Sequence, residues 1–269
     1  MLKQRIITAL VIAPIAIACV FFMPISGFYA FIGTVIAVSA WEWANLAGYE
    51  GAAKYLYAAF ISSLMLGSMF IPPEWILAPA MVWWLFALVL VVKYPGLESK
   101  WSSQLARSII GVFVLLPGFV SLVQLKQSID GDFLILLLFF LIWGADIGAY
   151  FSGRAFGKAK LAPRVSPGKS WAGVWGGLTT AVVISMGMTY WLGKPDLMTE
   201  RGAVFLLACL FVAVISVLGD LTISMFKRQR GVKDSSNLLP GHGGFLDRLD
   251  SLFAAGPTFC LFILANGWV

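Results

Sequence analysis

The chain has 269 residues, of which 60% are hydrophobic and only 12% are charged, and its mean hydropathy is +0.89. A soluble core of this length would bury far fewer apolar side chains, so the composition excludes an ordinary water-soluble domain. The formal net charge is +6. Because the basic residues occupy short loops beside apolar runs, this charge indicates membrane topology and not nucleic-acid binding.

Nine apolar runs of roughly 17 to 23 residues follow one another along the chain, and about 20 such residues cross the hydrocarbon core as a helix. A helix is expected because it satisfies its own backbone groups in lipid. The predicted spans are 6–23, 26–48, 55–71, 75–92, 107–125, 133–152, 171–192, 203–225 and 250–267. The first span lacks a convincing cleavage site and is expected to remain as an anchor. We therefore predict an all-α integral membrane protein with one polytopic domain, residues 1–269.

Basic residues divide unevenly between the two sides of these spans. With the N-terminus in the cytoplasm, only three of the 19 lie outside: Lys126, Lys194 and Arg201. Nine spans then place the C-terminus on the opposite side. Five acidic residues fall near the cytoplasmic ends of their helices: Glu42, Asp146, Asp220, Asp247 and Asp250. An ionised carboxylate within a span costs about 2.5–3.5 kcal/mol, so this cluster is expected to face a partner, a wet cavity or a cation.

The connection between the sixth and seventh spans carries basic residues beside glycine and serine. Ser166-Pro-Gly-Lys-Ser170 precedes span seven, where backbone amides, a lysine and a helix N-terminus suit a phosphate. This is not a Walker A loop, because the first glycine of that spacing is absent and no strand is predicted before it. The alternative is a basic loop that holds anionic lipid headgroups.

The segment from Gly219 to Ser251 is more specific. Its polar residues fall on two helical faces: Asp220, Ser224 and Lys227 on one, and Asp247, Asp250 and Ser251 on the other. Between them, residues 240–244 (Pro-Gly-His-Gly-Gly) predict a tight non-helical turn. Mg²⁺ prefers one or two carboxylates with phosphate oxygens and water. Two acidic helices across a basic, glycine-bearing loop therefore predict a site for magnesium-bound phosphates.

The run from Ser224 to Asp250 reads S-x-F-K-R-x4-K-D-x-S-x2-L-P-x-H-G-G-F-x-D-R-L-D and resembles the signature of phosphatidate cytidylyltransferases, also called CDP-diacylglycerol synthases. No specified position departs from that pattern. Gly144–Asp146, Lys158–Ser170 and Trp41–Trp43 also resemble the bacterial enzymes, so the resemblance covers most of the chain. It implies that phosphatidate and CTP give CDP-diacylglycerol and pyrophosphate at the cytoplasmic face of the cell inner membrane.

The resemblance also implies roles for particular residues, with the catalytic part at about residues 140–255. The catalytic candidates are Asp220, Lys227 and Asp247, and the candidate Mg²⁺ ligands are Asp220, Asp247 and Asp250. The candidate substrate contacts are Asp146, Lys169, Ser170, Ser224, Arg228, Lys233, His242 and Arg248. A phosphate monoester is mostly a dianion at neutral pH, so His242 is not required as a general base. Whether a second, monovalent cation binds and whether the chain forms a homodimer are left open.

Structural alternatives exist for several of these residues. Asp250 and Ser251 also suit a cap of span nine, and Arg248 suits an ion pair with a neighbouring aspartate. Glu42 is expected to be a structural partner for a loop lysine. The glycines of 171–177 are expected to permit close helix packing.

The sequence argues against three other classes of protein. In a transporter or channel, charged residues are expected near the bilayer midplane and on both sides of the membrane. This chain concentrates them at one face. A CDP-alcohol phosphotransferase requires a D-G-x2-A-R…G-x3-D-x3-D pattern, which the sequence lacks. A purely structural scaffold would leave the Ser224 to Asp250 run unexplained.

Overall fold

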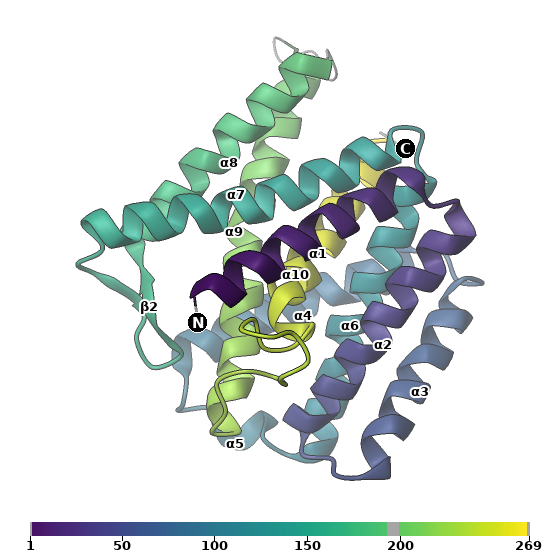
Figure 1. The fold of residues 1–269 in the computed structure, drawn as a ribbon, viewed down its shortest axis with the longest axis vertical. Coiled ribbons are helices and arrows are strands. Elements are labelled where there is room, and N and C mark those ends of the chain that lie inside the picture. The colour runs from purple at the N-terminus through teal and green to yellow at the C-terminus, as the bar shows by residue number, and fades with distance from the viewer. Residues whose placement is uncertain (1, 193–198, 268–269) are drawn as a thin grey trace.

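The computed structural model describes residues 2–192 and 199–267, and Lys194 lies outside them. Apart from one short hairpin, the elements are helices (Figure 1). In chain order they are α1 (Leu2–Phe22), α2 (Ile25–Ala47), α3 (Ala52–Ser68), α4 (Glu74–Lys93), α5 (Glu98–Trp101), α6 (Gln104–Gln127), α7 (Gly131–Phe156), β1 (Lys160–Ala162), β2 (Ser166–Ser170), α8 (Trp171–Leu192), α9 (Glu200–Gln229) and α10 (Leu246–Ala265).

Each predicted span corresponds to one of the long helices. Within the described ranges, seven helices are long and apolar enough to cross a membrane: α2, α4, α6, α7, α8, α9 and α10. The other two predicted spans correspond to α1 and to α3, which has 17 residues. The fold is that of an all-α membrane protein, as predicted. The count of nine crossings and the sides of the two termini stay predictions.

Apolar side chains cover much of the outer surface as well as the core. Phe22 is 86% exposed and Phe70 is 90% exposed, whereas Trp43 and Phe253 are fully buried. A water-soluble monomer rarely exposes so much contiguous apolar surface, so lipid is the solvent for this face. The cysteines Cys19, Cys209 and Cys260 are free and buried.

Helices α7 and α8 pack closely through small residues. A Cβ at Gly177 would lie 2.8 Å from the Ala145 carbonyl oxygen, and one at Gly173 would lie 3.0 Å from the Ala149 oxygen. The prediction that these glycines permit close helix packing is therefore confirmed. Since apolar burial does not drive helices together in lipid, such close contact is what holds this pair. It sets the position of Asp146, which follows Ala145 on α7.

No strand was expected before Ser166–Ser170 in the connection between α7 and α8, and that expectation was wrong, because β1 precedes this segment. β1 and β2 form an antiparallel hairpin in which Lys160 pairs with Ser170 and Ala162 pairs with Ser166. A hydrogen bond joins its turn to the end of α9: Arg228 Nε donates to the Val165 carbonyl oxygen at 3.2 Å. The hairpin therefore lies against α9, and β2 leads directly into α8 (Figure 1).

The two ends of α1 contact opposite ends of the bundle. Thr8 Oγ1 donates a hydrogen bond to the Pro240 carbonyl oxygen at 2.9 Å, in the connection between α9 and α10. Near the other end, Lys126 of α6 donates to the Val20 carbonyl oxygen and forms an ion pair with Asp132. The start of α1 therefore lies on the same side of the bundle as the segment from Ser224 to Asp250.

Candidate functional site

The centre of the site is an ion pair between the hairpin and α9. Lys169 Nζ on β2 lies 2.7 Å from Asp220 Oδ2, and each side chain is about one-quarter exposed. Ser224, one turn along α9, donates its hydroxyl to Asp220 Oδ1 at 3.1 Å, which confirms the predicted shared face. Burial disfavours the Lys169 ammonium, but attraction to Asp220 outweighs it and raises the pKa of Lys169. Lys169 is therefore positively charged at neutral pH.

Two more carboxylates surround this pair. Asp146 of α7 and Asp250 of α10 both interact electrostatically with Asp220 and with Lys169. Gly219 makes the approach of α9 to α10 possible, because a Cβ there would lie 2.5 Å from the Asp250 carbonyl oxygen. Three helices thus bring three carboxylates near one ammonium, and cation binding by these carboxylates stays a prediction.

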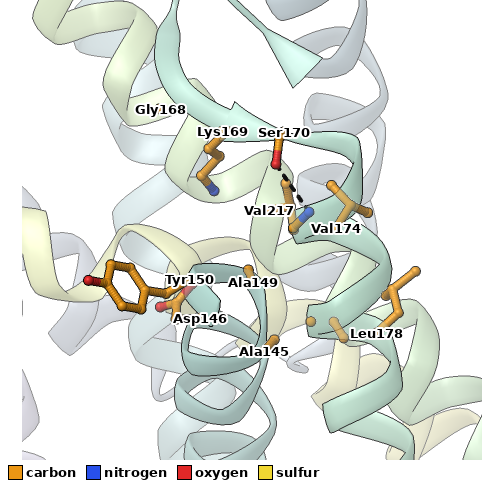
Figure 2. Close-up of a pocket in the computed structure, with 13 residues that line it drawn as sticks. Ala145, Asp146, Ala149, Tyr150, Gly168, Lys169, Ser170, Val174, Leu178 and Val217 are labelled. Carbon is orange, nitrogen blue, oxygen red and sulfur yellow. Dashed lines mark hydrogen bonds between the residues drawn. The ribbon is translucent and has the colours of Figure 1, made fainter. Parts of the chain in front are cut away.

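A cavity of about 190 Å³ opens beside this cluster. Asp146, Lys169 and Ser170 line it together with small residues of α7 and α8. Lys169 reaches from β2 toward the helix that carries Asp146 (Figure 2). The Ser170 hydroxyl accepts a hydrogen bond from Gly173 N at 3.2 Å, so this side chain also caps the first turn of α8. The end of the predicted phosphate segment, Gly168–Ser170, therefore lines this cavity. We call it the polar cavity because it carries Asp146, Lys169 and Ser170 among its apolar lining residues.

A second ion pair joins the end of α9 to the start of α10. Lys227 Nζ lies 2.7 Å from Asp247 Oδ1, and both side chains are buried. Asp247 Oδ2 accepts hydrogen bonds from Ser235 N at 2.7 Å and Gly244 N at 2.9 Å, and the Ser235 hydroxyl lies 2.9 Å from the same oxygen. These four donors engage both oxygens of Asp247, so this carboxylate fixes the connection between α9 and α10. Metal binding by Asp247, which stays a prediction, requires it to release some of these donors.

Glu42 is the residue whose partners differ most from expectation. Its side chain is fully buried on α2 and accepts hydrogen bonds from Phe245 N at 3.1 Å and Leu246 N at 2.6 Å. It also accepts from the Ser236 hydroxyl at 2.5 Å, and the Ser235 hydroxyl, which donates to Asp247, lies 3.3 Å from Glu42 Oε2. The expectation of a lysine partner was wrong, because Glu42 caps the first amides of α10. A carboxylate inside a span was the sequence signal for such a role.

The remaining predicted residues lie around the connection from α9 to α10. Its turn is tight, as predicted: Gly241 and Gly243 have φ values of 75° and 81°, and His242 N donates to the Leu239 oxygen at 2.9 Å. Three predicted substrate contacts are exposed: Arg228, Lys233 and Arg248. Their cationic groups therefore remain accessible to a ligand.

Two structural alternatives are settled by the start of α10. The helix begins at Leu246, so Asp250 and Ser251 lie one turn inside it and do not cap it. Instead, Asp250 Oδ1 accepts a hydrogen bond from Ser251 N at 2.8 Å. Within the described ranges, Arg248 forms no ion pair with a neighbouring aspartate.

Comparison with known proteins identifies the family. The sequence profile described as "Cytidylyltransferase family" matches residues 3–265. A phosphatidate cytidylyltransferase of Pseudomonas aeruginosa is 50% identical, and the alignment covers 100% of this chain and 99% of that protein. One from Haemophilus influenzae is 39% identical, with 97% and 98% covered, and one from Rickettsia typhi is 32% identical, with 76% and 90% covered. The chain belongs to the cytidylyltransferase family.

Proposed function

We propose that this chain is a phosphatidate cytidylyltransferase, which joins phosphatidate to CTP and releases CDP-diacylglycerol and pyrophosphate. The observation that carries the proposal is the Lys169–Asp220 pair, set among Asp146 and Asp250 where three spanning helices meet a polar hairpin. One substrate is a lipid and the other a water-soluble nucleotide, so they meet at a membrane interface. The positive-inside rule supports the cytoplasmic face of a bacterial inner membrane as this interface.

The reaction needs no nucleophile from the protein. A phosphate oxygen of phosphatidate attacks the α-phosphorus of CTP, a new P–O bond forms, and the bond to the bridging oxygen of the β-phosphate breaks. Pyrophosphate leaves with that electron pair. Because the monoester is mostly a dianion at neutral pH, no base has to remove a proton. Charge repulsion between the substrates dominates the barrier, so positioning and neutralisation provide most of the catalysis.

The basic residues would provide that neutralisation. Lys169 lines the polar cavity and already pairs with the Asp220 carboxylate, and a substrate phosphate would share its ammonium. Arg228, an exposed residue at the end of α9, donates its Nε–H to Val165 of the hairpin, and Lys233 is exposed in the following connection. We assign Arg228 and Lys233, together with Lys227, to the phosphates of CTP and the departing pyrophosphate.

Mg²⁺ fits the acidic side of the site. Asp220 and Asp250 provide carboxylate oxygens from two closely packed helices, and hard oxygen ligands are those that Mg²⁺ prefers. Asp146 would add negative charge on the third side. A bound Mg²⁺ would neutralise charge on the CTP phosphates. Asp247 would join these ligands after exchanging its contact with Lys227.

The test is an assay of purified protein in detergent with phosphatidate, radiolabelled CTP and Mg²⁺. The parent protein is expected to form labelled CDP-diacylglycerol, and Asp220→Asn to lose about 10²-fold or more of that rate. Asp130→Asn is the matched control, because Asp130 is exposed before α7 and outside the site. A parent protein without CDP-lipid product would overturn the function, and a fully active Asp220→Asn would overturn the site.

A further inference from the structure

A second and larger cavity lies beside the polar one. Its volume is about 920 Å³, and its walls come from α4, the β1–β2 hairpin, α8 and α9, with one contact from α10. The walls are almost entirely apolar, and Arg164 at the hairpin turn is the one charged residue in the described lining. A nucleotide would find almost no hydrogen-bond partners there, so the cavity suits hydrocarbon.

The two cavities are adjacent. Val174 of α8 and Val217 of α9 line both of them. The hairpin forms part of both walls as well, since Arg164 borders the apolar cavity and Lys169 borders the polar one. A molecule that occupied both would therefore need a hydrocarbon part joined directly to an anionic part.

The apolar cavity is also open to the lipid-facing surface. Val92 of α4 and Val214 of α9 line it, and their side chains are 73% and 43% exposed. A lipid chain can thus enter sideways from the bilayer without leaving an apolar environment.

We propose that this cavity binds an acyl chain of the lipid substrate and so aligns the lipid phosphate with Lys169. The inference rests on the proposed function and adds the site at which the acyl chain of the lipid substrate binds. Because hydrocarbon gains little by moving from bilayer to protein, selectivity for phosphatidate arises where the phosphate meets Arg164 and Lys169. The cavity then acts by positioning the nucleophilic oxygen.

The kinetic test fills the cavity from two different helices, α4 and α9. Val214→Trp and Val92→Trp are each expected to raise KM for long-chain phosphatidate about tenfold, and to leave KM for CTP unchanged. A water-soluble, short-chain phosphatidate should be affected less. The matched controls, Val204→Trp on α9 and Val82→Trp on α4, replace exposed valines outside the lining and should behave as the parent does.

The inference would be overturned if both cavity variants kept the KM of the parent, or if the controls showed equal increases in KM. CDP-lipid formation by the parent protein would still support the proposed function in that case. A binding test needs no turnover. Phosphatidate with a photoreactive group in its acyl chain should label the β1–β2 hairpin, α4 or α9. Excess phosphatidate should suppress that labelling and phosphatidylcholine with the same chains should not. Equal suppression by both lipids would identify ordinary surrounding lipid and refute the assignment.

Discussion

Replacing Glu42 by glutamine tests whether this buried carboxylate holds the start of α10. Oε1 of Glu42 accepts from the Phe245 amide and the Ser236 hydroxyl. Oε2 accepts from the Leu246 amide and lies 3.3 Å from the Ser235 hydroxyl, whose single hydrogen is donated to Asp247. In Glu42→Gln, one oxygen becomes an NH₂ group. Either orientation places that donor against a backbone N–H, which is unable to rotate away as a hydroxyl does.

The substitution therefore removes one hydrogen bond between a charged group and a buried amide, which is worth about 1.5–3 kcal/mol. The loss falls at the first turn of α10, just before Asp247 and Asp250. We expect a lower unfolding temperature and a reduced kcat. Unfolding in detergent is measured with a thiol-reactive fluorogenic dye, because the buried thiols of Cys19, Cys209 and Cys260 become reactive only as the fold opens.

Glu50→Gln is the control, because Glu50 is an exposed glutamate just after α2. This variant should unfold at the temperature of the parent. A Glu42→Gln protein with the stability and turnover of the parent would refute the capping role. Ser236→Ala adds a second check. It removes one donor to Oε1, so its effect should be smaller in the Glu42→Gln background than in the parent.

Three further outcomes are expected. Gly219→Ala would push its Cβ into the Asp250 backbone and separate α9 from α10, so both the unfolding temperature and the turnover should fall. The control is Gly187→Ala, whose Cβ would meet nothing within 4 Å and which should match the parent in both assays. Lys227→Met should lower the free energy of unfolding by about 3–5 kcal/mol, because it leaves the buried Asp247 carboxylate without its cation. Adding Asp247→Asn should recover part of that stability in thermal unfolding. A double variant less stable than Lys227→Met would contradict this reasoning. EDTA should abolish CDP-lipid formation and added Mg²⁺ should restore it, so full activity in excess EDTA would refute the metal requirement.

Much of the site could be predicted from local sequence. The contact between Ser224 and Asp220 follows from helical spacing, and the turn around His242 follows from its flanking glycines. The partner of Glu42 could not be predicted in this way, because Ser235 is 193 positions away in the chain. The role of Asp247 in fixing the connection between α9 and α10 could not be predicted either, because its oxygens accept from donors on α9 and in that connection.

The sequence by itself determined the membrane class, the approximate helices and the family signature. These follow from local rules, since every spanning segment must satisfy its backbone within one helix. Tertiary structure alone decided the β1–β2 hairpin, the pairing of Lys169 with Asp220 and the apolar cavity beside them. These features depend on how closely α7, α8, α9 and α10 pack, and that distance is set by glycines whose contacts lie on other helices.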